Sequence, residues 1–469
     1  MNLPLFTDDQ FARLADEVRQ VLREIGYHVA HPRVKQMALA AGCAESAAGR
    51  VLFHDAQIQE LKARLEAQYP KAAPAQGLHG KWMAATSWGN ITPKVFNYAR
   101  QMPEGGNAQN LAQLVRFAHS APQITGLTLP LSRQDVPPQV EQIESLVLMA
   151  KLTDKPLGAL DVTVPEAVPF VARMGEALGR DPAQFVGCCN CINPPLRLEE
   201  RTAETMLRRA PLHSMSMVTP MPCIGGSSPM DTYGSIIQGT AEIIGGLILS
   251  TIVDPDCPLM GYIASTQVDM RTGNITSSSP QTVQVDGGVY QLMEKHFGGG
   301  TRIGGRTYIS ARKPGFAAVF EKLLKTVGYS QLVEENAFTY AGGGTLDNGS
   351  MTSPEQLLLD LEVSEGLAAL TQEPVIPAEG EIVRRMREGI LDLGGSFLVH
   401  DHTLTTYRQE MWDPQYFQRA TRGRTEQEML DQAHEEVQRR TAEYQPASHP
   451  EDVVRELEAI AAEARATLL

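Results

Sequence analysis

Residues 155–179 read KPLGALDVTVPEAVPFVARMGEALG, a short apolar run followed at once by a helical stretch. The run has the length of a buried strand, and the segment after it spaces its apolar residues as one face of a helix does. Short apolar runs recur along the chain, and most of them precede a helix-like segment. The eight predicted strands are ITGLTLPL (124–131), KPLGALDVT (155–163), FVGCCNCI (185–192), HSMSMVTPM (213–221), CPLMGYIAST (257–266), TRIGGRTYI (301–309), FTYAGGGTL (338–346) and SFLVHDHTL (396–404).

Eight strand–helix alternations over about 280 residues match a (β/α)8 TIM barrel in count and length. A doubly wound parallel sheet also alternates strands and helices, but eight units with a helical appendage favour the barrel. We therefore predict an α/β fold with three parts. These are a mainly helical and irregular N-terminal extension at 1–115, a (β/α)8 barrel at 116–410, and C-terminal helices at 411–469 that pack on the barrel.

Local signals place several helices outside and inside the barrel. The segment Thr7–Gln10 has the pattern of a capping box, and apolar residues then follow at helical spacing. Further helices are expected near 32–41 and 55–67. Ser353 precedes a proline at the first helical position and a glutamine at the third, so a helix should begin there.

Composition and charge exclude several classes of partner. The chain of 469 residues has 41 Lys and Arg against 55 Asp and Glu, a net charge of −14. This charge argues against nucleic acid or an anionic membrane as the main partner. The N-terminus lacks a secretory signal, the longest apolar stretch (243–252) is too short to span a bilayer, and the six cysteines form no disulfide framework. We predict a cytoplasmic protein, and a homo-oligomer.

Functional groups of a barrel lie where its strands end at the C-terminal face. The predicted strand ends are polar but carry few carboxylates and no evident acid/base pair, which excludes a glycosidase-like site. They also lack a P-loop and a serine nucleophile motif. The candidate residues at these ends are Pro130, Ser132, Asp161, Thr163, Asn190, Asn193, Thr219, Met221, Tyr262, Ser265, Thr266, Arg306, Thr307, Tyr308, Gly342, Gly343, Gly344, Thr345, His400 and His402.

Two metal-site hypotheses arise from these residues. His400 and His402 would share one face of a strand, and with Asp161 they would suit a metal-dependent TIM-barrel hydrolase. No histidine ends predicted strands four to six, and His213 precedes strand four, which weakens this hypothesis. Cys189 and Cys191 also share a face and could hold zinc in a zinc-thiolate methyltransferase, although small thiols commonly just fill barrel layers.

Four stretches resemble the trimethylamine methyltransferase family, in particular its members without pyrrolysine, such as the glycine betaine methyltransferases. The N-terminal stretch is LADEVRQVLREIGYHVAHPRV (14–34). The central stretch is IGGSSPMDTYGSIIQGTAEIIGGLILSTIVDPDCPLMGY (224–262). The C-terminal stretches are SPEQLLLDLEV (353–363) and FLVHDHTLTTYRQEMWDP (397–414).

The resemblance implies a (β/α)8 barrel that transfers a methyl group from an amine to the cobalt of a separate corrinoid protein. In the archaeal trimethylamine enzymes a pyrrolysine lies near the end of strand six, where this chain has the standard residues 306–309. The resemblance therefore implies a quaternary amine, with glycine betaine as the first choice. The chain has no D-x-H-x-x-G corrinoid-binding signature, so the corrinoid (cobalamin) is expected on the partner, with no tightly bound cofactor in this chain.

A quaternary ammonium carries no N–H donors, so aromatic faces hold it best, and an in-line methyl transfer needs positioning more than a general acid. We expect Thr307, Tyr308, His400 and His402 to position the reactants, with no acid/base catalyst and no metal. Gly343, Gly344 and Thr345 are expected to face the corrinoid. Residues expected to bind substrate are Phe96, Tyr98, Asp161, Asn190, Thr219, Tyr262, Ser265, Arg306, Tyr340 and Phe397.

Overall fold

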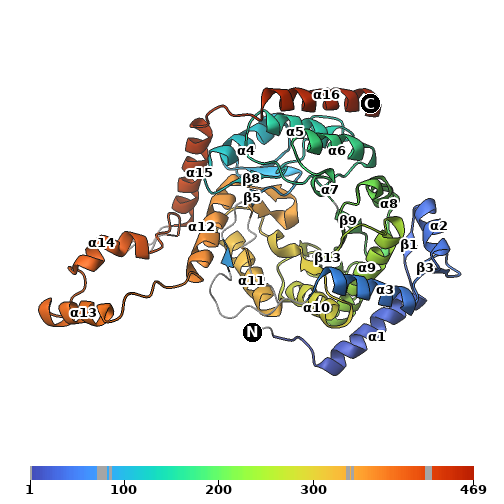
Figure 1. The fold of residues 1–469 in the computed structure, drawn as a ribbon, viewed down its shortest axis with the longest axis horizontal. Coiled ribbons are helices and arrows are strands. Elements are labelled where there is room, and N and C mark those ends of the chain that lie inside the picture. Colours follow the sequence, from blue (N-terminus) through green and yellow to red (C-terminus); the bar gives the residue numbers. More distant parts are fainter. Residues whose placement is uncertain are drawn as a thin grey trace.

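A ring of parallel strands forms the centre of the protein, seen here in a computed structural model that describes residues 3–70, 82–83, 87–187, 189–333, 338–339, 343–417 and 425–469 (Figure 1). Of residues 82–83 and 338–339 only the backbone is described. The strands of the ring are β4 (Trp82–Met83), β5 (Ser87–Trp88), β8 (Gly126–Leu127), β9 (Cys189–Ile192), β11 (Ser216–Pro220), β13 (Leu259–Ile263), β16 (Thr301–Ile303) and β17 (Phe338–Thr339), with residues 157–160 between β8 and β9.

Parallel pairings join these strands in chain order. β5 pairs with β8, and single bridges link Leu127 to Leu157 and Leu160 to Val186. β9, β11, β13 and β16 follow as one four-stranded sheet. β17 then pairs in parallel with β4, so the last strand lies beside the first. Among the described residues, β16 and β17 are the neighbouring strands of the ring that no backbone pairing joins.

Each strand of the ring is followed by a helix on the outside, which confirms the predicted (β/α)8 class. The helices surround the strands in Figure 1. They are α4 (Ala108–Ser120), α5 (Glu141–Ala150), α6 (Val168–Ala177), α8 (Glu200–Arg209), α9 (Thr232–Val253), α10 (Pro280–His296), α11 (Phe316–Leu332) and α12 (Pro354–Leu370), with the short α7 (Pro182–Phe185) before β9.

The predicted strand series is shifted by one unit. The ring begins at residues 82–88, inside the segment that was assigned to the N-terminal extension, and it ends at β17. The predicted eighth strand, 396–404, is wrong, because α14 (Asp401–Glu410) begins within it. The apolar residues Leu398 and Val399 misled the prediction, since both are largely exposed in the structure.

The N-terminal helices pack against the outside of the barrel. Thr7 forms the predicted capping box at the start of α1 (Asp8–Glu24), and this helix packs on α9 and α10. Ser353 likewise caps α12 with Pro354 at its first position, as predicted. The remaining elements of this region are α2 (Pro32–Ala40), α3 (Asp55–Gln68), β1 (His28–Val29), β2 (Ala44–Glu45), β3 (Val51–Leu52) and β10 (Arg197–Leu198).

Helix α9 is the most apolar helix of the chain. By length and composition it could cross a membrane, yet 83% of its most apolar window is buried inside the protein. Val218 of β11 and Ile243 of α9 lie against glycines of the facing element, which brings helix and strand close together. Its hydrophobicity is therefore explained by its place in the core between the barrel and the N-terminal helices.

Two groups of short strands lie beyond the C-terminal ends of the ring. The first is a four-stranded sheet after the first and last ring strands, in the order β18, β19, β6, β7, and the second follows β11 and β13 in the order β12, β14, β15. Their bounds are β6 (Lys94–Asn97), β7 (Met102–Gly105), β18 (Thr345–Leu346), β19 (Met351–Thr352), β12 (Cys223–Ile224), β14 (Thr266–Val268) and β15 (Ile275–Thr276). The chain also forms four short 3-10 helical turns, which are η1 (Pro165–Ala167), η2 (Ala210–Leu212), η3 (Gly305–Thr307) and η4 (Asp347–Gly349).

The C-terminal region has two different parts. Helices α15 (Glu426–Ala442) and α16 (Glu451–Leu468) pack on the barrel helices α4, α5, α6 and α12, consistent with the predicted cover. Before them, α13 (Glu381–Arg387), the π-helical turn η5 (Glu388–Asp392) and α14 form an arm that projects away from the body in Figure 1. We call residues 370–411 the arm.

Candidate active site

The inner wall of the barrel is open to water along β9, β11, β13 and β16. Side chains that face the surrounding helices, such as Val218, are fully buried. The alternate residues point to the inside, and among them Cys191 and Arg302 are exposed. The interior of a barrel is usually filled with side chains. This barrel instead has an accessible lumen near the C-terminal ends of its strands.

Strand register brings polar residues together in this lumen. Cys191 lies beside Thr219 across the β9–β11 pair, and Tyr262 lies beside Arg302 across the β13–β16 pair. Thr219 and Tyr262 occupy equivalent inward positions on neighbouring strands. The sequence prediction included Thr219 and Tyr262 but missed Arg302, whose inward direction depends on the register of a three-residue strand.

Two tyrosine rings each lie against a glycine that leaves room for them. A Cβ atom at Gly304 would lie 1.9 Å from Cε1 of Tyr262, and one at Gly349 would lie 2.6 Å from Cε1 of Tyr308. Any larger residue at either position would displace the ring. The glycines after β16 and in η4 therefore fix where the two aromatic faces stand.

Tyr308 shares one electrostatic neighbourhood with the lumen residues. Burial above all, and then the neighbouring Tyr262, the two thiols of β9 and Asp161, together raise the pKa of the Tyr308 phenol to about 12. The phenol is therefore neutral at physiological pH. These interactions indicate that Asp161, at the end of the third strand, and Tyr308, after the seventh, face the same space.

Asp161 is the carboxylate of this lumen. Its Oδ1 accepts a hydrogen bond of 3.2 Å from the backbone N–H of Cys189, while burial raises the pKa of the carboxyl above its usual range. The backbone hydrogen bond and the charge of Arg209 oppose this rise in the pKa. A bound cation would stabilise the ionised form.

The two thiols lie 3.7 Å apart, sulfur to sulfur, on the same face of β9, as predicted. The hydrogen bond between them lowers the pKa of Cys191 and raises that of Cys189. The Sγ atom of Cys189 also lies 3.3 Å from Oγ1 of Thr219. Cys191 is thus the more acidic thiol of the pair. Cys188 lies outside the described residues.

A buried network behind the wall fixes the segment that carries Arg306, Thr307 and Tyr308. The Lys325 ammonium of α11 donates to the carbonyl oxygens of Gly305 and Tyr308, the latter at 2.7 Å. Asp286 of α10 accepts from Tyr329 Oη at 2.6 Å and from the backbone N–H of Ser265 at 2.8 Å. Burial raises the pKa of Asp286 to about 6 and lowers that of Lys325 to about 8.

A second buried pair fixes the start of the segment after β17. Lys322 Nζ lies 2.6 Å from Oδ2 of Asp360, and the backbone N–H of Gly344 donates to the same oxygen at 2.8 Å. The carbonyl of Gly343 accepts from the indole N–H of Trp88 at 3.0 Å. Thr345 is buried. The prediction that Thr345 faces a corrinoid is therefore wrong, because its side chain has no exposed surface, while Gly343 and Gly344 are anchored to the barrel wall.

The structure brings together only part of the predicted substrate-binding set. Asp161, Thr219 and Tyr262 border the lumen, and Arg306 and Thr307 lie in η3 next to Tyr308. Asn190 and Ser265 were wrongly expected to face substrate. Asn190 is buried on the helix side of β9, where it bonds Ser216 and Arg209, and Ser265 Oγ donates to the carbonyl of Thr282.

The aromatic residues of the segment after the first strand were also misplaced. Phe96 is buried against Ile309 and Leu346 in a small core cluster. Tyr98 stacks on His434, with ring centroids 4.4 Å apart, and donates to Asp431 at 2.7 Å. Both residues line a pocket of about 440 Å³ between the β6–β7 hairpin and α15, not the lumen. Tyr340 and Gly342 lie outside the described residues.

The histidine pair lies in the arm, which corrects the largest error of the sequence prediction. His400 caps α14 and its Nε2 lies 3.3 Å from Glu388, while His402 Nε2 lies 2.8 Å from Arg385. Phe397 stacks on His400. These residues stand with α14, far from the barrel in Figure 1, so they cannot form a metal site with Asp161 or position a substrate beside it.

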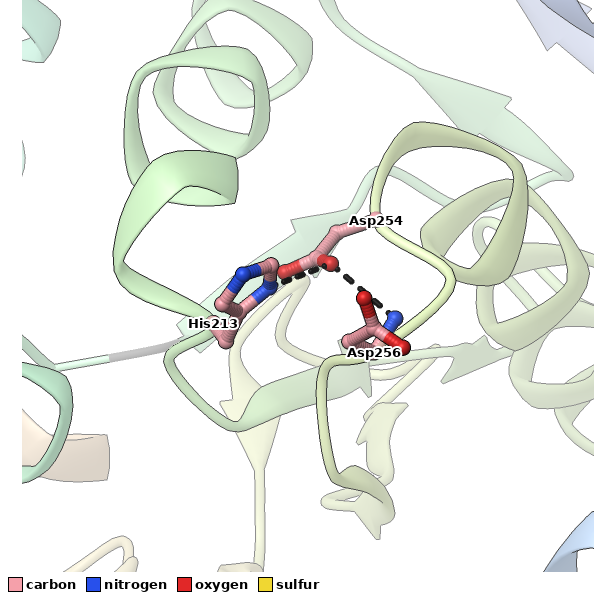
Figure 2. A group of neighbouring side chains, drawn as sticks. All are labelled: His213, Asp254 and Asp256. Carbon is pink, nitrogen blue, oxygen red and sulfur yellow. Dashed lines mark hydrogen bonds and ion pairs between the residues drawn. The ribbon is translucent and has the colours of Figure 1, made fainter.

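Among the described residues, one cluster has the composition of a metal site, and it lies at the opposite end of the barrel. Figure 2 shows His213, which precedes β11, beside Asp254 and Asp256, which precede β13. His213 Nδ1 is 2.9 Å from Asp254, and that same oxygen accepts the N–H of Asp256 at 3.1 Å. His213 and Asp254 thus form an ion pair that joins two loops, and the backbone N–H of Asp256 adds a hydrogen bond to it.

Comparison with known proteins identifies the family of this barrel. Residues 1–468 match the family model described as trimethylamine methyltransferase. The trimethylamine methyltransferase MttB of Methanosarcina barkeri is 23% identical over 422 residues, 86% of this chain and 83% of that protein. The glycine betaine methyltransferase of Desulfitobacterium hafniense strain Y51 is 21% identical over 483 residues, covering 98% and 96%.

Among solved structures, the monomethylamine methyltransferase MtmB of Methanosarcina barkeri aligns over 97% of this chain and 93% of its own, with a TM-score of 0.41 and 9% identity. The family model spans nearly the whole length, and the relatives are named methyltransferases. The resemblance found in the sequence is confirmed: the chain is a methyltransferase that belongs to the trimethylamine methyltransferase family.

Proposed function

We propose that this enzyme transfers a methyl group from a quaternary amine, glycine betaine first, to a Co(I) corrinoid carried by a separate protein in the cytoplasm. The observation that carries the proposal is the accessible lumen, in which a carboxylate and two aromatic rings stand together with Arg302. The relative named as a glycine betaine methyltransferase aligns over 98% of the chain, which supports this choice of substrate.

The lumen offers complementary groups for both ends of a betaine. Asp161 and the faces of Tyr262 and Tyr308 suit a trimethylammonium group, which has no hydrogen to donate and is best stabilised by charge and by π-electron density. The guanidinium of Arg302, beside Tyr262, suits the carboxylate at the other end. Held in this way, the substrate would present one N-methyl group toward the mouth of the barrel.

For this reaction the residues of the lumen need to orient the substrate and exclude water from it, and they need not transfer a proton. A quaternary ammonium leaves as a neutral tertiary amine once a methyl group is removed, so no side chain needs to protonate it. Tyr308, with its pKa of about 12, stays neutral and adds no competing charge. Desolvation of the bound ammonium by the tyrosine faces would favour loss of its positive charge in the reaction.

We place the corrinoid, delivered by a partner protein, at the barrel mouth. Beside it, the β14–β15 hairpin borders a pocket of about 670 Å³ on whose rim Met230, Met270 and Ile275 are exposed. Exposed apolar side chains around an open pocket suit a large flat macrocycle and the protein that carries it. Bound there, a Co(I) corrinoid supplies the nucleophile that accepts the methyl group.

The test is turnover with purified protein, a chemically reduced Co(I) corrinoid and a panel of methylated amines. We expect dimethylglycine from glycine betaine, and less product from choline, which lacks the carboxylate. Asp161→Asn should raise KM for betaine more than it lowers kcat, because it weakens ground-state binding of the cation. Asp413→Asn, a change of the same chemistry outside the lumen, serves as the control. No product from any quaternary amine, or a clear preference for trimethylamine, would refute the proposal.

A zinc-thiolate methyltransferase is a second candidate, and the distance between the two sulfur atoms of β9 favours it. Two thiolates on a tetrahedral zinc with bonds of about 2.3 Å stand roughly 3.8 Å apart, close to the 3.7 Å between Cys189 and Cys191. Metal analysis of the active protein separates the two candidates. Stoichiometric zinc that disappears in Cys191→Ser, together with the activity, would favour the zinc enzyme.

A further inference from the structure

The arm carries most of the exposed apolar side chains of the protein. Of the 27 large hydrophobic residues exposed in the described parts of the chain, 15 lie between Leu370 and Met411, a segment of 42 residues. Val375, Ile376 and Leu398 each expose about four-fifths or more of their surface. Single exposed apolar residues are ordinary, but such a concentration marks an interaction surface.

The arm has no hydrophobic core of its own. Neither α13 nor α14 has a buried residue, and they contain 7 and 10 residues. Isolated helices of this length are marginal in water. The polar contacts of His402 with Arg385 and of His400 with Glu388 join the two helices and leave their apolar side chains turned outward. Packing against another surface would supply the stabilisation that the arm lacks.

A second exposed apolar surface lies on the barrel itself, where Phe316 packs at one end on Phe417 with ring centroids 6.2 Å apart. The outer face of α11 exposes Phe316, Phe320, Leu324 and Val327, which follow one another at helical spacing. We call these four residues the α11 stripe. Ala317 is the other exposed residue between 316 and 330, so this face presents no exposed charge to the solvent. The outer helices of a barrel ordinarily turn polar residues outward.

The arm does not reach the stripe of its own chain. Figure 1 shows α13 and α14 standing clear of the body on one side, whereas α11 lies within the ring of barrel helices. A separation seen in projection is a lower limit to the separation in space. Within the described residues of one copy, the arm and the side chains of Phe320, Leu324 and Val327 therefore stay exposed, and a second copy offers each surface its counterpart.

We propose that the arm of one copy docks on the α11 stripe of a second copy, which returns its own arm, so that the protein assembles by exchange of arms. The exposed fractions in the arm add up to about nine fully exposed large side chains. At somewhat over 100 Å² each, they offer on the order of 1,000 Å², whereas the exposed fractions of the stripe add up to about two such side chains. The arm must therefore also cover the surface beside the stripe to reach the ~800 Å² per partner of a standard stable interface. The proposal is independent of the reaction that the lumen performs.

Four proteins test this arrangement by size-exclusion chromatography with light scattering and by sedimentation at micromolar concentration. The arm variant is Leu391→Asp/Leu398→Asp, and the stripe variant is Phe320→Asp/Val327→Asp. The control, Ile25→Asp/Met102→Asp, adds the same charge at half-exposed apolar residues elsewhere. All the changed side chains are exposed, so folding should persist, and circular dichroism checks this. The fourth protein is the unchanged chain.

We expect the unchanged chain and the control to be oligomers. Each of the other variants should associate at least roughly 100-fold more weakly, because two carboxylates would enter an apolar contact. An equimolar mixture of the arm variant and the stripe variant should recover association, since the intact arm of one then meets the intact stripe of the other. This complementation is specific to an arm–stripe contact.

Other outcomes overturn the proposal. A stripe variant that associates as the unchanged chain does would mean that arms pair with arms or with another surface. An arm variant that associates normally would exclude the arm. A monomeric unchanged chain would mean that a different protein covers the arm. Loss of association in both variants without recovery in the mixture would also refute arm–stripe exchange.

Discussion

Glu242 gives the protein a stability that depends on pH, and a single isosteric change should remove that dependence. This carboxyl lies in the middle of α9 with no exposed surface. Its Oε1 accepts from the N–H of Leu196 at 2.9 Å and from Gln238 at 3.0 Å. Oε2 is buried without a hydrogen-bond partner among the described residues. Burial raises the pKa of the group to about 8 from an ordinary 4.5.

The sign and size follow from proton linkage. At neutral pH the folded protein holds a proton on Glu242 that the unfolded chain has lost, so the free energy of unfolding falls as pH rises from about 4.5 to about 8. Each pKa unit is worth ~1.4 kcal/mol, which makes ~5 kcal/mol the upper limit of the whole effect. Between pH 6 and 8.5 the loss is ~2.5 kcal/mol.

Glu242→Gln keeps the shape and the acceptor but cannot ionise, so it should lose this part of the pH dependence. The entropy of unfolding of a chain this long is about 1 kcal/mol per kelvin, so the expected change corresponds to 2–3 °C in Tm. The variant's Tm relative to the unchanged protein should therefore rise by about 2–3 °C between pH 6 and 8.5, as measured by scanning calorimetry.

The matched control is Glu435→Gln, the same change at an exposed position of α15. Its Tm difference from the unchanged protein should not vary with pH. If the difference for Glu242→Gln is equally constant from pH 6 to 8.5, then the buried carboxyl does not hold its proton in the folded state, and the reasoning fails.

Three further changes test other parts of the structure. Tyr262→Leu should raise KM for a quaternary amine roughly 10-fold, as loss of an aromatic face costs about 1–2 kcal/mol, whereas Tyr262→Phe should have little effect; equal effects would argue against a cation site. Lys325→Met should lower stability by roughly 3–5 kcal/mol, because it removes the positive charge that acts on buried Asp286 and the hydrogen bonds of the ammonium to the carbonyls of Gly305 and Tyr308, and an unchanged Tm would contradict this. His402→Ala should leave kcat and KM for the methyl transfer unchanged, and a large loss of activity in the assembled protein would contradict its placement in the arm.

Local patterns were enough to predict the class of fold and several helix boundaries. Short apolar runs that alternate with amphipathic stretches indicate an α/β fold, because each strand is buried and each helix needs one apolar face, and eight such units favour a (β/α)8 barrel. The caps at Thr7 and Ser353 were predicted from side chains that bond backbone groups only three residues away. The shared face of Cys189 and Cys191 follows from the two-residue period of a strand.

The limits of the ring were not predictable in this way. β4 and β17 pair across more than 250 residues, and β4 lies in an irregular segment without a long apolar run. Residues 396–400 do form such a run but belong to the arm. An apolar run indicates only that the side chains of a segment are stabilised by burial away from water. It does not say whether that burial occurs inside the same chain.

By itself the sequence determined the alternation of strands and helices, the caps, and the shared face of the two thiols, since each depends on residues close together in the chain. The tertiary structure alone decided which segment closes the ring, that Arg302 points into the lumen, that Lys325 holds the Tyr308 segment, and that His400 and His402 stand outside the barrel. The physical reason is that strand register, burial and charge pairing depend on groups that only folding brings together.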